Sequence, residues 1–175
     1  MNLIFVGPMG SGKSTVGRLA AVALRREFAD TDEWIEGASG LSVGEIFARE
    51  GEAGFRERET AALRALLGPG DRVVATGGGI VVSRANRTLL REGGLVVLLL
   101  ASPATLWRRL APQAGSRPRL AVADPLDVLR RDLEIRGPWY REVSSFTIEA
   151  DSAEAAAMQA VAALERAEGR GVAST

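Results

Sequence analysis

Residues 2–15 constrain the fold of this chain more than any other stretch. An apolar run, NLIFV, leads directly into the glycine-rich segment GPMGSGKST (residues 7–15). Gly7 to Ser14 match the pattern G-x-x-x-x-G-K-[ST], and a helical pattern begins at Lys13. A buried strand, a phosphate-binding loop and a helix in this order predict a parallel sheet that binds a nucleoside triphosphate.

Each residue type in this loop suits the binding of phosphate. Gly10 and Gly12 let the backbone curl until successive N–H groups point at phosphate oxygens, at the positive end of a helix. Ser14 has a hydroxyl for Mg²⁺ and Thr15 has one for a phosphate. Lys13 is the only lysine, although Lys and Arg together number 22. The position needs a compact charge on a thin stem, so the broad fork of Arg does not fit there.

Composition excludes several classes of site. The chain has no Cys and no His, which excludes disulfides, thiolate metal sites, cysteine nucleophiles and histidine general bases. A length of 175 residues and a formal net charge of zero predict one domain and argue against a nucleic-acid partner. No apolar run approaches the ~18 residues of a membrane span, and the start lacks the basic region of a signal peptide. We therefore expect a cytoplasmic monomer that binds neither nucleic acid nor a membrane.

Short apolar segments alternate with longer helical patterns along the chain. The expected strands are residues 2–6, 26–30, 71–76, 94–101 and 144–150. The expected helices are residues 13–25, 31–38, 42–50, 52–67, 83–92, 103–110, 124–141 and 152–168, with Ser83 and Ser152 as N-caps and Pro103 in a first turn. This order predicts an α/β fold of the P-loop NTPase type, similar to nucleoside monophosphate kinases, with a five-stranded parallel sheet in a three-layer α/β/α sandwich.

Domain organisation follows from the same reading. Residues 1–168 are expected to form a single domain, and residues 169–175 a disordered tail. The segment at about 111–124 is rich in Pro, Gly and Ala and is expected to form a mobile lid. No N-K-x-D motif for guanine occurs, which disfavours a GTPase, and the chain is short for a motor. A small kinase with a second substrate pocket remains.

Two acidic residues in the segment FADTD (residues 28–32) lie at the end of the second expected strand and the beginning of the next helix. Ligands of open α/β sheets bind at the carboxyl ends of strands, beside the phosphates in this case. One of Asp30 and Asp32 would then hold Mg²⁺, and the other would accept a proton from an attacking hydroxyl. The alternative, which the spacing supports equally, is that both only cap the helix that begins near Thr31.

Two further segments carry unusual residues. In GEAGFRERE, Arg56 and Glu59 are three residues apart and can pair on a helix, although a solvated charged face is the simpler interpretation. Gly77, Gly78 and Gly79 directly follow an expected buried strand. Three successive glycines cost conformational entropy, so we favour the approach of a ligand to the backbone over a simple tight turn.

Taken together, these motifs resemble the shikimate kinase family. In the order of that family, the sequence has GPMGSGKST, FADTD, GEAGFRERE, the three glycines, Arg117-Pro118 and IRGPWYREV, which contains Arg136. The resemblance spans essentially the whole chain, and six motifs in register are far more specific than the phosphate loop alone. It implies a kinase domain that transfers the γ-phosphate of ATP, with Mg²⁺, to the 3-hydroxyl of shikimate. The products would be shikimate 3-phosphate and ADP, in the chorismate route to aromatic amino acids.

The resemblance also implies a role for each matching residue. The ATP-binding residues would be Gly10, Ser11, Gly12, Lys13, Ser14, Thr15, Arg109 and Arg117. Ser14 and Asp30 would bind the metal, and Lys13, Asp32 and Arg117 would be catalytic. The shikimate-binding residues would be Asp32, Arg56, Glu59, Gly77, Gly78, Gly79 and Arg136, with Phe47 and Phe55 as apolar walls.

Within this set, Asp32 would act as the base and Glu59 would orient the two arginines that clamp the shikimate carboxylate. Arg109 would lie near the adenine, and Arg117 would swing onto the phosphates from the lid. One departure from the family is Arg119, where apolar residues commonly follow the R-P pair; it leaves open which lid arginine contacts phosphate. Trp139 and Tyr140 are expected to pack in the core rather than touch substrate.

Other functions share parts of this pattern. A gluconate-kinase-like enzyme would keep the phosphate loop and differ in the residues that bind the acid. A nucleoside monophosphate kinase is similar in the core only and lacks the three glycines. A catalytically silent kinase-like module would have lost Lys13, Asp32 or a substrate arginine, and all of these are present.

Overall fold

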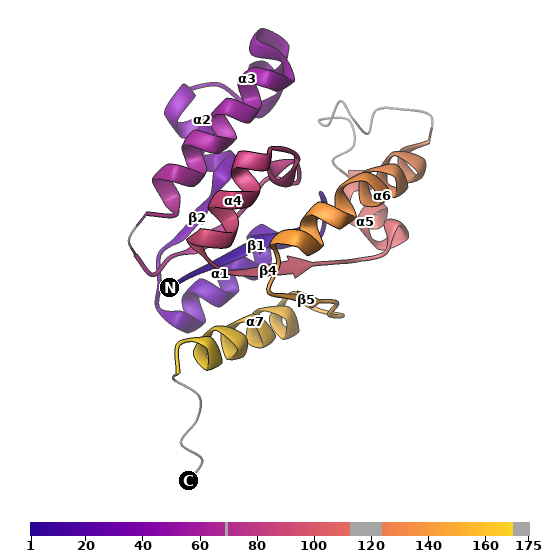
Figure 1. Cartoon of the computed structure of the whole chain (residues 1–175). Helices are drawn as coiled ribbons and strands as arrows, with labels where there is room; N and C mark the ends of the chain where they lie inside the picture. The colour runs from indigo at the N-terminus through magenta and orange to yellow at the C-terminus, as the bar shows by residue number, and fades with distance from the viewer. Residues whose placement is uncertain (69, 113–123, 170–175) are drawn as a thin grey trace.

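The computed structural model describes residues 1–68, 70–112 and 124–169 (Figure 1). The strands in these ranges are β1 (Asn2–Val6), β2 (Phe28–Asp30), β3 (Val73–Ala75), β4 (Gly94–Leu99) and β5 (Phe146–Ile148). The helices there are α1 (Lys13–Leu24), α2 (Thr31–Ser39), α3 (Val43–Leu66), α4 (Arg84–Gly93), α5 (Pro103–Leu110), α6 (Pro125–Val143) and α7 (Ala153–Ala167), with a 3₁₀ turn, η1, at Ile80–Val82.

The described strands form one parallel sheet in the order β2-β3-β1-β4-β5. β1 lies at the centre, where its residues are all buried, as the continuous apolar run NLIFV predicts. Since every pair is parallel, the carboxyl ends of the strands meet at one edge of the sheet. The loops that follow β1, β2 and β3 therefore lie together at that edge, and these loops carry the phosphate motif, Asp30 and the three glycines.

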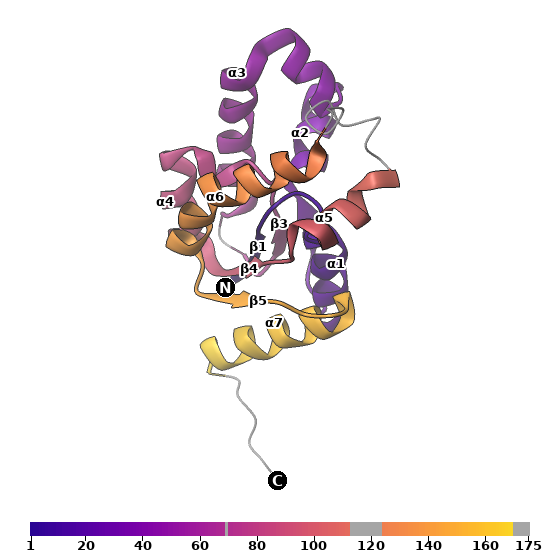
Figure 2. The same cartoon turned by 90° about the vertical axis from the view of Figure 1, so that its right-hand side faces the viewer.

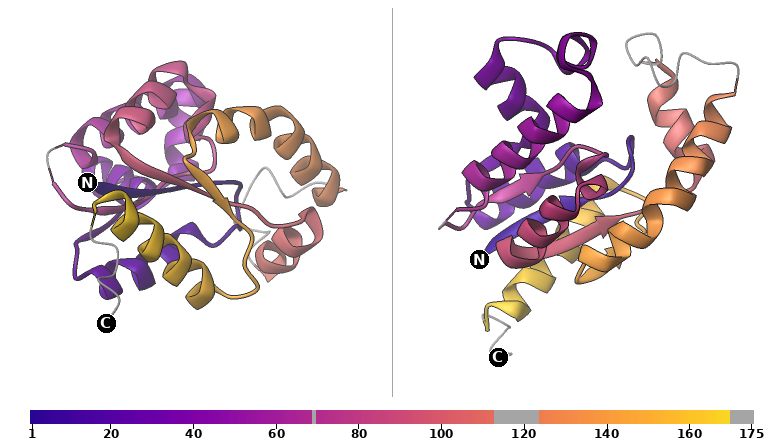
Figure 3. Two further views of the ribbon diagram at one scale, coloured as in Figure 1. Left: turned by 60° about the horizontal axis from the view of Figure 1, so that its bottom comes forward. Right: turned by 45° about the horizontal axis from the view of Figure 1, so that its top comes forward.

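Helices cover both faces of the sheet, which gives the expected three layers (Figure 3). Leu3 and Phe5 of β1 pack against α1 and α7 on one face. Ile4 and Val6, which point the opposite way, pack against α3, α4 and α6 on the other. The fold class predicted from the sequence is confirmed, since the alternating side chains of one strand supply two separate cores.

Two helix pairs also have small cores of their own, and the ribbons of both pairs extend beyond the sheet (Figure 2). In the first, α2 and α3 pack through Ile35, Ile46 and Phe55. In the second, α5 and α6 pack through Leu106 and Leu129. Both pairs follow or precede loops at the carboxyl edge of the sheet, so they stand on the same side as the candidate site.

Several boundaries differ from the sequence predictions. The strand expected at 26–30 begins only at Phe28, because Arg25 adopts a left-handed conformation (φ 54°) and the Arg26 N–H bonds back to the Ala21 carbonyl to end α1. The two helices expected at 42–50 and 52–67 run on as α3, interrupted at Gly51 by a non-helical conformation (φ 70°, ψ −173°). The short 3₁₀ turn η1 was not predicted. Ser83 and Ser152 do cap α4 and α7, and Pro103 does begin α5.

Part of the expected lid and tail cannot be compared with the structure. Arg117 and Arg119, with the rest of residues 113–123, lie outside the described residues, as do residues 170–175 of the tail. At the end of the lid segment, Asp124 is the N-cap of α6 and accepts a bond from the Asp127 N–H. Within the described part of the chain, none of the helices has both the length and the apolar character that a bilayer crossing needs.

Candidate active site

The segment of residues 7–15 forms a cradle between β1 and α1, and we call it the phosphate cradle. Gly10 and Gly12 have φ values of 79° and 92°, which residues with a Cβ rarely adopt. These two turns leave the N-terminus of α1 open toward the loop, as the motif predicts. The buried Lys13 donates from Nζ to the Pro8 carbonyl at 2.8 Å and to Ser11 Oγ at 3.4 Å, so its ammonium lies within the curl of the loop.

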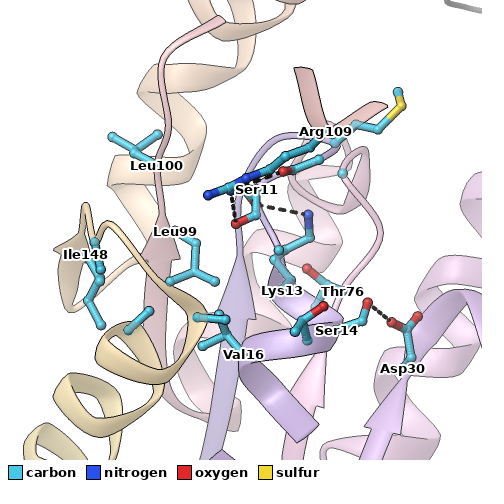
Figure 4. Close-up of a pocket in the computed structure, with 18 of the residues that line it drawn as sticks. Ser11, Lys13, Ser14, Val16, Asp30, Thr76, Leu99, Leu100, Arg109 and Ile148 are labelled. Carbon is cyan, nitrogen blue, oxygen red and sulfur yellow. Dashed lines mark hydrogen bonds between the residues drawn. The ribbon is translucent and has the colours of Figure 1, made fainter. Parts of the chain in front are cut away.

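Ser14 and Asp30 form the candidate metal site beside the cradle. Ser14 Oγ donates to Asp30 Oδ2 at 2.6 Å (Figure 4). The other carboxylate oxygen, Asp30 Oδ1, accepts the Asp32 N–H at 2.9 Å and so caps α2. The two interpretations of Asp30 are therefore compatible, because one oxygen caps the helix and the other faces Ser14. A hydroxyl and a carboxylate are the hard oxygen ligands that Mg²⁺ prefers, so the residues present fit this ion.

A cavity of about 580 Å³ opens above the cradle, within the usual size of ligand pockets. Its lining residues are Met9 to Val16, Asp30, Asp32, Thr76, Gly77, Gly78, Leu99, Leu100, Arg109, Leu110, Ile148, Ala150, Ser152, Ala153 and Ala156. On one side Arg109 donates from Nη1 to the Gly10 and Ser11 carbonyls at 3.4 and 3.3 Å. Arg109 thus lies against the phosphate cradle, and its expected position near the adenine stays a prediction.

The apolar wall of this cavity is the part that the sequence analysis missed. Leu99 and Ile148 lie opposite Ser14 and Asp30 (Figure 4), and Ala153 and Ala156 of α7 continue the same wall. β4 and β5 are neighbours in the sheet, so their carboxyl ends meet although nearly fifty residues separate them. The local signal that could have indicated this wall is the run of small residues at the start of α7.

The three glycines lie against two side chains that sequence analysis assigned to substrate. A Cβ on Gly77 would lie 2.6 Å from Asp32 Oδ1, and one on Gly79 would lie 2.2 Å from Arg56 Nη1. None of the three glycines has a positive φ. Gly77 and Gly79 are therefore required for the room they leave to Asp32 and Arg56, and not for an unusual turn. The close neighbours in the structure are protein atoms, and the expected approach of a ligand to this backbone stays a prediction.

Arg56 and Glu59 pair across one turn of α3, as their spacing predicts, with Arg56 Nη1 donating to Glu59 Oε2 at 2.6 Å. Arg56 also donates from Nη2 to Glu52 at 2.8 Å. Glu59 is fully buried, and its Oε1 makes no hydrogen bond within the described residues. Burial raises the pKa of Glu59 to about 7, and the charge of Asp32 adds to this, although Arg56 and Arg136 lower it.

Arg136 and Tyr140, one turn apart on α6, both reach the middle glycine. Arg136 Nη1 donates to the Gly78 carbonyl at 3.2 Å, and its Nη2 lies 3.4 Å from Asp132 Oδ1. The Tyr140 hydroxyl donates to the same Gly78 carbonyl. Tyr140 is buried in the core, as expected, and Trp139 packs against the same cluster. The polar end of Tyr140 nevertheless touches the loop of the site, which sequence analysis did not predict.

Phe47 and Phe55 stack at the top of the α2–α3 pair, with ring centroids 4.5 Å apart. Phe55 is buried, whereas Phe47 is partly buried against it.

We call Asp32, Arg56, Glu59 and Arg136, together with Gly77 to Gly79, the triple-glycine cluster. Of this cluster, the cavity is lined by Asp32, Gly77 and Gly78 only, and not by Arg56, Glu59, Gly79 or Arg136. They lie immediately behind it, through Gly77 and Gly78.

Comparison with known proteins agrees with this arrangement. The family model described as shikimate kinase matches residues 9–165. A shikimate kinase from Marinomonas sp. (strain MWYL1) is 48% identical over 153 residues, which covers 86% of this chain and 84% of the relative. The structure of a shikimate kinase from Acinetobacter baumannii in complex with shikimate has a TM-score of 0.86 and 40% identity, and covers 97% of this chain and 93% of that one.

The gluconate-kinase alternative resembles this chain in fold alone. A gluconokinase from Sinorhizobium meliloti 1021 has a TM-score of 0.58 and 23% identity, over 95% of this chain and 93% of that one. This chain belongs to the shikimate kinase family, whose members are ATP- and Mg²⁺-dependent enzymes that phosphorylate shikimate.

Proposed function

We propose that this chain transfers the γ-phosphoryl group of ATP to the 3-hydroxyl of shikimate, with the phosphate cradle and the triple-glycine cluster as its two half-sites. The observation that carries the proposal is the position of Asp32. Asp32 lines the cavity above the cradle, and its carboxylate also abuts Gly77 in the triple-glycine cluster. A carboxylate between the two half-sites is suitably located to meet a hydroxyl that attacks a phosphate.

The cradle would bind the phosphates of ATP through Gly10, Ser11, Gly12, Lys13, Ser14 and Thr15. Its backbone N–H groups and the α1 N-terminus attract anionic oxygens. Lys13 would leave its bonds to Pro8 and Ser11 and extend toward the β- and γ-phosphates. Ser14 and Asp30 would hold Mg²⁺, which when bound offsets the negative charge of the phosphate oxygens.

The nucleotide base would lie on the opposite side of the cradle from Asp30. Arg109 and the apolar wall of Leu99, Ile148 and Ala153 would enclose it. Arg117, which lies outside the described residues, would add a charge to the phosphates from the lid as water is excluded. We retain Arg117 over Arg119 for this role.

The triple-glycine cluster would bind shikimate. Arg56 and Arg136 would clamp its carboxylate, for which the planar forks of arginine are well suited. Glu59 already holds Arg56 at 2.6 Å and would keep it oriented as the acid arrives. Backbone N–H groups of Gly78 and Gly79 would meet the substrate beside Gly77, with Phe47 and Phe55 as apolar walls.

In the transfer step, the shikimate hydroxyl oxygen would bond to the γ-phosphorus as the bond to the bridging oxygen of ADP breaks. The hydroxyl proton would pass to the Asp32 carboxylate. Lys13 would stabilise charge on the oxygens of the transferring group. Each of these steps needs positioning more than covalent chemistry, in agreement with a site that has no Cys and no His.

We further propose a cytoplasmic monomer with one domain over residues 1–168, and with no nucleic-acid or membrane partner. A formal net charge of zero supports this, since nucleic acid and anionic membrane surfaces attract basic proteins. Light scattering coupled to size exclusion tests the monomer, which predicts a mass near 18.5 kDa. A mass of twice that value would contradict it.

The direct test of function is ADP release with Mg²⁺ and ATP in three parallel reactions, with shikimate, gluconate or AMP as acceptor. ADP formed with shikimate alone is the expected result. ADP formed with gluconate or AMP instead would keep the phosphate cradle and overturn the assignment of the triple-glycine cluster. ATP binding without ADP release in any reaction would indicate a catalytically silent module.

A further inference from the structure

The Gly78 carbonyl is held from one direction only. Before it in the chain, the Thr76 N–H donates to the Phe5 carbonyl at 3.1 Å, and the Gly77 N–H donates to Thr31 Oγ1 at 2.9 Å. Gly79 accepts from the Val82 N–H at 3.0 Å. The hydrogen bonds that reach the Gly78 carbonyl within the described residues come from α6. The orientation of the Gly78–Gly79 peptide plane therefore depends on that helix.

Two donors share this one carbonyl, but they differ in what else they do. Arg136 donates at 3.2 Å and also faces Asp132, and it is the arginine that the proposed function recruits to the substrate carboxylate. Tyr140 is 1% exposed, with its ring enclosed in the core and its hydroxyl on Gly78. When Arg136 turns to the acid, Tyr140 is the donor that remains in place.

The same peptide carries the N–H of Gly79. The structure has no cis peptide bonds among its described residues, and in a trans peptide the N–H points opposite to the carbonyl. The Gly79 N–H thus points away from α6. A hydrogen bond accepted by a carbonyl also polarises the N–H of the same peptide and strengthens it as a donor.

We propose that Tyr140 is a positioning residue for the acceptor substrate, which fixes and polarises the Gly78–Gly79 peptide so that the Gly79 N–H can donate to a hydroxyl of that substrate. This inference rests on the proposed function of the triple-glycine cluster. Gly78 also links the two half-sites, because a Cβ there would lie 3.1 Å from the Met9 backbone nitrogen in the phosphate cradle. A tilt of this peptide would therefore affect substrate binding more than the binding of phosphates in the cradle.

The Tyr140 hydroxyl is suited to a constant role. Burial raises its pKa to about 12, although Arg136 acts in the opposite direction. The group thus stays protonated, and remains a donor, at every pH at which the enzyme would be assayed. An anchor that titrated near neutrality would instead release the loop as the pH rose.

The variant that tests this is Tyr140→Phe, which keeps the ring and removes the hydroxyl. Loss of one hydrogen bond near a binding site is expected to raise KM for shikimate about tenfold. KM for ATP should stay within about twofold of the wild-type value. The matched control is Val143→Ala, in the same helix and the same core cluster, whose side chain has no group that could hydrogen-bond to Gly78. It should lower the melting temperature and leave both KM values unchanged.

A ligand-free measurement separates this inference from the proposed function. In ¹⁵N-labelled protein without substrate, Tyr140→Phe should move the Gly79 amide nitrogen resonance upfield, since its peptide carbonyl has lost a donor. Val143→Ala should not move it. An unmoved Gly79 resonance in Tyr140→Phe would overturn the inference whatever the substrate is. So would equal changes in KM for both substrates, or a Val143→Ala variant that reproduces the shikimate effect.

If the wild-type protein released no ADP with shikimate, the proposed function would fail, and the resonance would still test the role of Tyr140 in the loop. A shifted Gly79 resonance with an unchanged KM for shikimate would also overturn the inference. It would show that the peptide is held by Tyr140 but does not serve the substrate.

Discussion

The phosphate cradle and the triple-glycine cluster are built in different ways. The cradle is one continuous segment, residues 7–15, and its own backbone forms most of it. The cluster takes Asp32 from α2, Arg56 and Glu59 from α3, the glycines from the loop after β3, and Arg136 from α6. A site within one segment can be identified from its amino-acid sequence. A cluster of residues from distant segments forms only once the sheet and its helices have packed.

Glycine shows the difference most clearly. In the cradle, Gly10 and Gly12 have positive φ, so backbone geometry requires them. In the cluster, Gly77 and Gly79 have ordinary φ values, and the missing Cβ makes room for Asp32 and Arg56. A glycine pattern can thus indicate either an unusual turn or a crowded packing, and only the second depends on residues elsewhere in the chain.

Asp32 is the residue at which the two half-sites meet, and its substitution should have the largest effect. Asp32→Asn keeps the shape and the N–H that Asp30 caps, but removes the base. We expect kcat to fall about a thousandfold, as for the loss of a general base. Affinity for ATP, measured by calorimetry, should stay within about twofold. Glu33→Gln, the exposed next residue, is the control, and near-wild-type turnover in Asp32→Asn would contradict the role.

Lys13→Arg tests whether the cradle depends on shape as well as charge. The wider guanidinium keeps the positive charge but does not fit within the curl around Pro8 and Ser11. We expect kcat to fall about a hundredfold, which is typical for loss of one stabilising donor. The reverse exchange on the exposed face of α1, Arg18→Lys, should leave kcat unchanged. Full activity in Lys13→Arg would mean that geometry does not select lysine there.

Gly79→Ala should damage the triple-glycine cluster and spare the cradle. The added Cβ would lie 2.2 Å from Arg56 Nη1, so the guanidinium must move from its place. We expect KM for shikimate to rise about tenfold, the effect of one displaced charged hydrogen bond, with KM for ATP unchanged. Gly37→Ala, where a Cβ would meet nothing within 4 Å, is the control. Equal rises in both KM values would show that the half-sites are not separable.

Glu59 predicts a dependence of stability on pH that originates in the cluster. Its pKa is about 7 when folded, against 4.5 for the free side chain, with Arg56, Asp32 and Arg136 as the charges that face it. Between pH 4.5 and about pH 7, Glu59 is protonated in the folded protein but has lost its proton in the unfolded chain. The free energy of unfolding therefore falls as the pH rises through this range, by roughly 3 kcal/mol in total.

Glu59→Gln should remove this pH dependence of the free energy of unfolding, because glutamine does not titrate. Urea unfolding from pH 4.5 to 7.5 is expected to give a flatter profile for the variant than for the wild type. Glu57→Gln, exposed on the same helix, is the control and should keep the wild-type profile. A wild-type protein that gained stability as the pH rose through this window, by an amount lost in Glu59→Gln, would contradict the sign of the effect.

The features that could be predicted from the sequence are those with a local cause. The cradle, the caps at Ser83 and Ser152 and the Arg56–Glu59 pair each depend on residues a few positions apart. The contacts that could not be predicted join distant segments, such as Tyr140 to Gly78 and the wall of Leu99 with Ile148. The resemblance to a known family supplied the expected role of Arg136 at the substrate carboxylate, which no spacing in this chain would indicate.

The central claim is that two separately built half-sites bind two ligands, and Arg136→Ala tests it most directly. Calorimetric titration of this variant with shikimate, and separately with Mg²⁺ and ATP, gives both affinities in the absence of turnover. We predict that the dissociation constant for shikimate rises by about thirtyfold, the worth of a charge-assisted contact, and that the value for ATP stays within about twofold. An unchanged affinity for shikimate, or an equal loss for both ligands, would contradict the account.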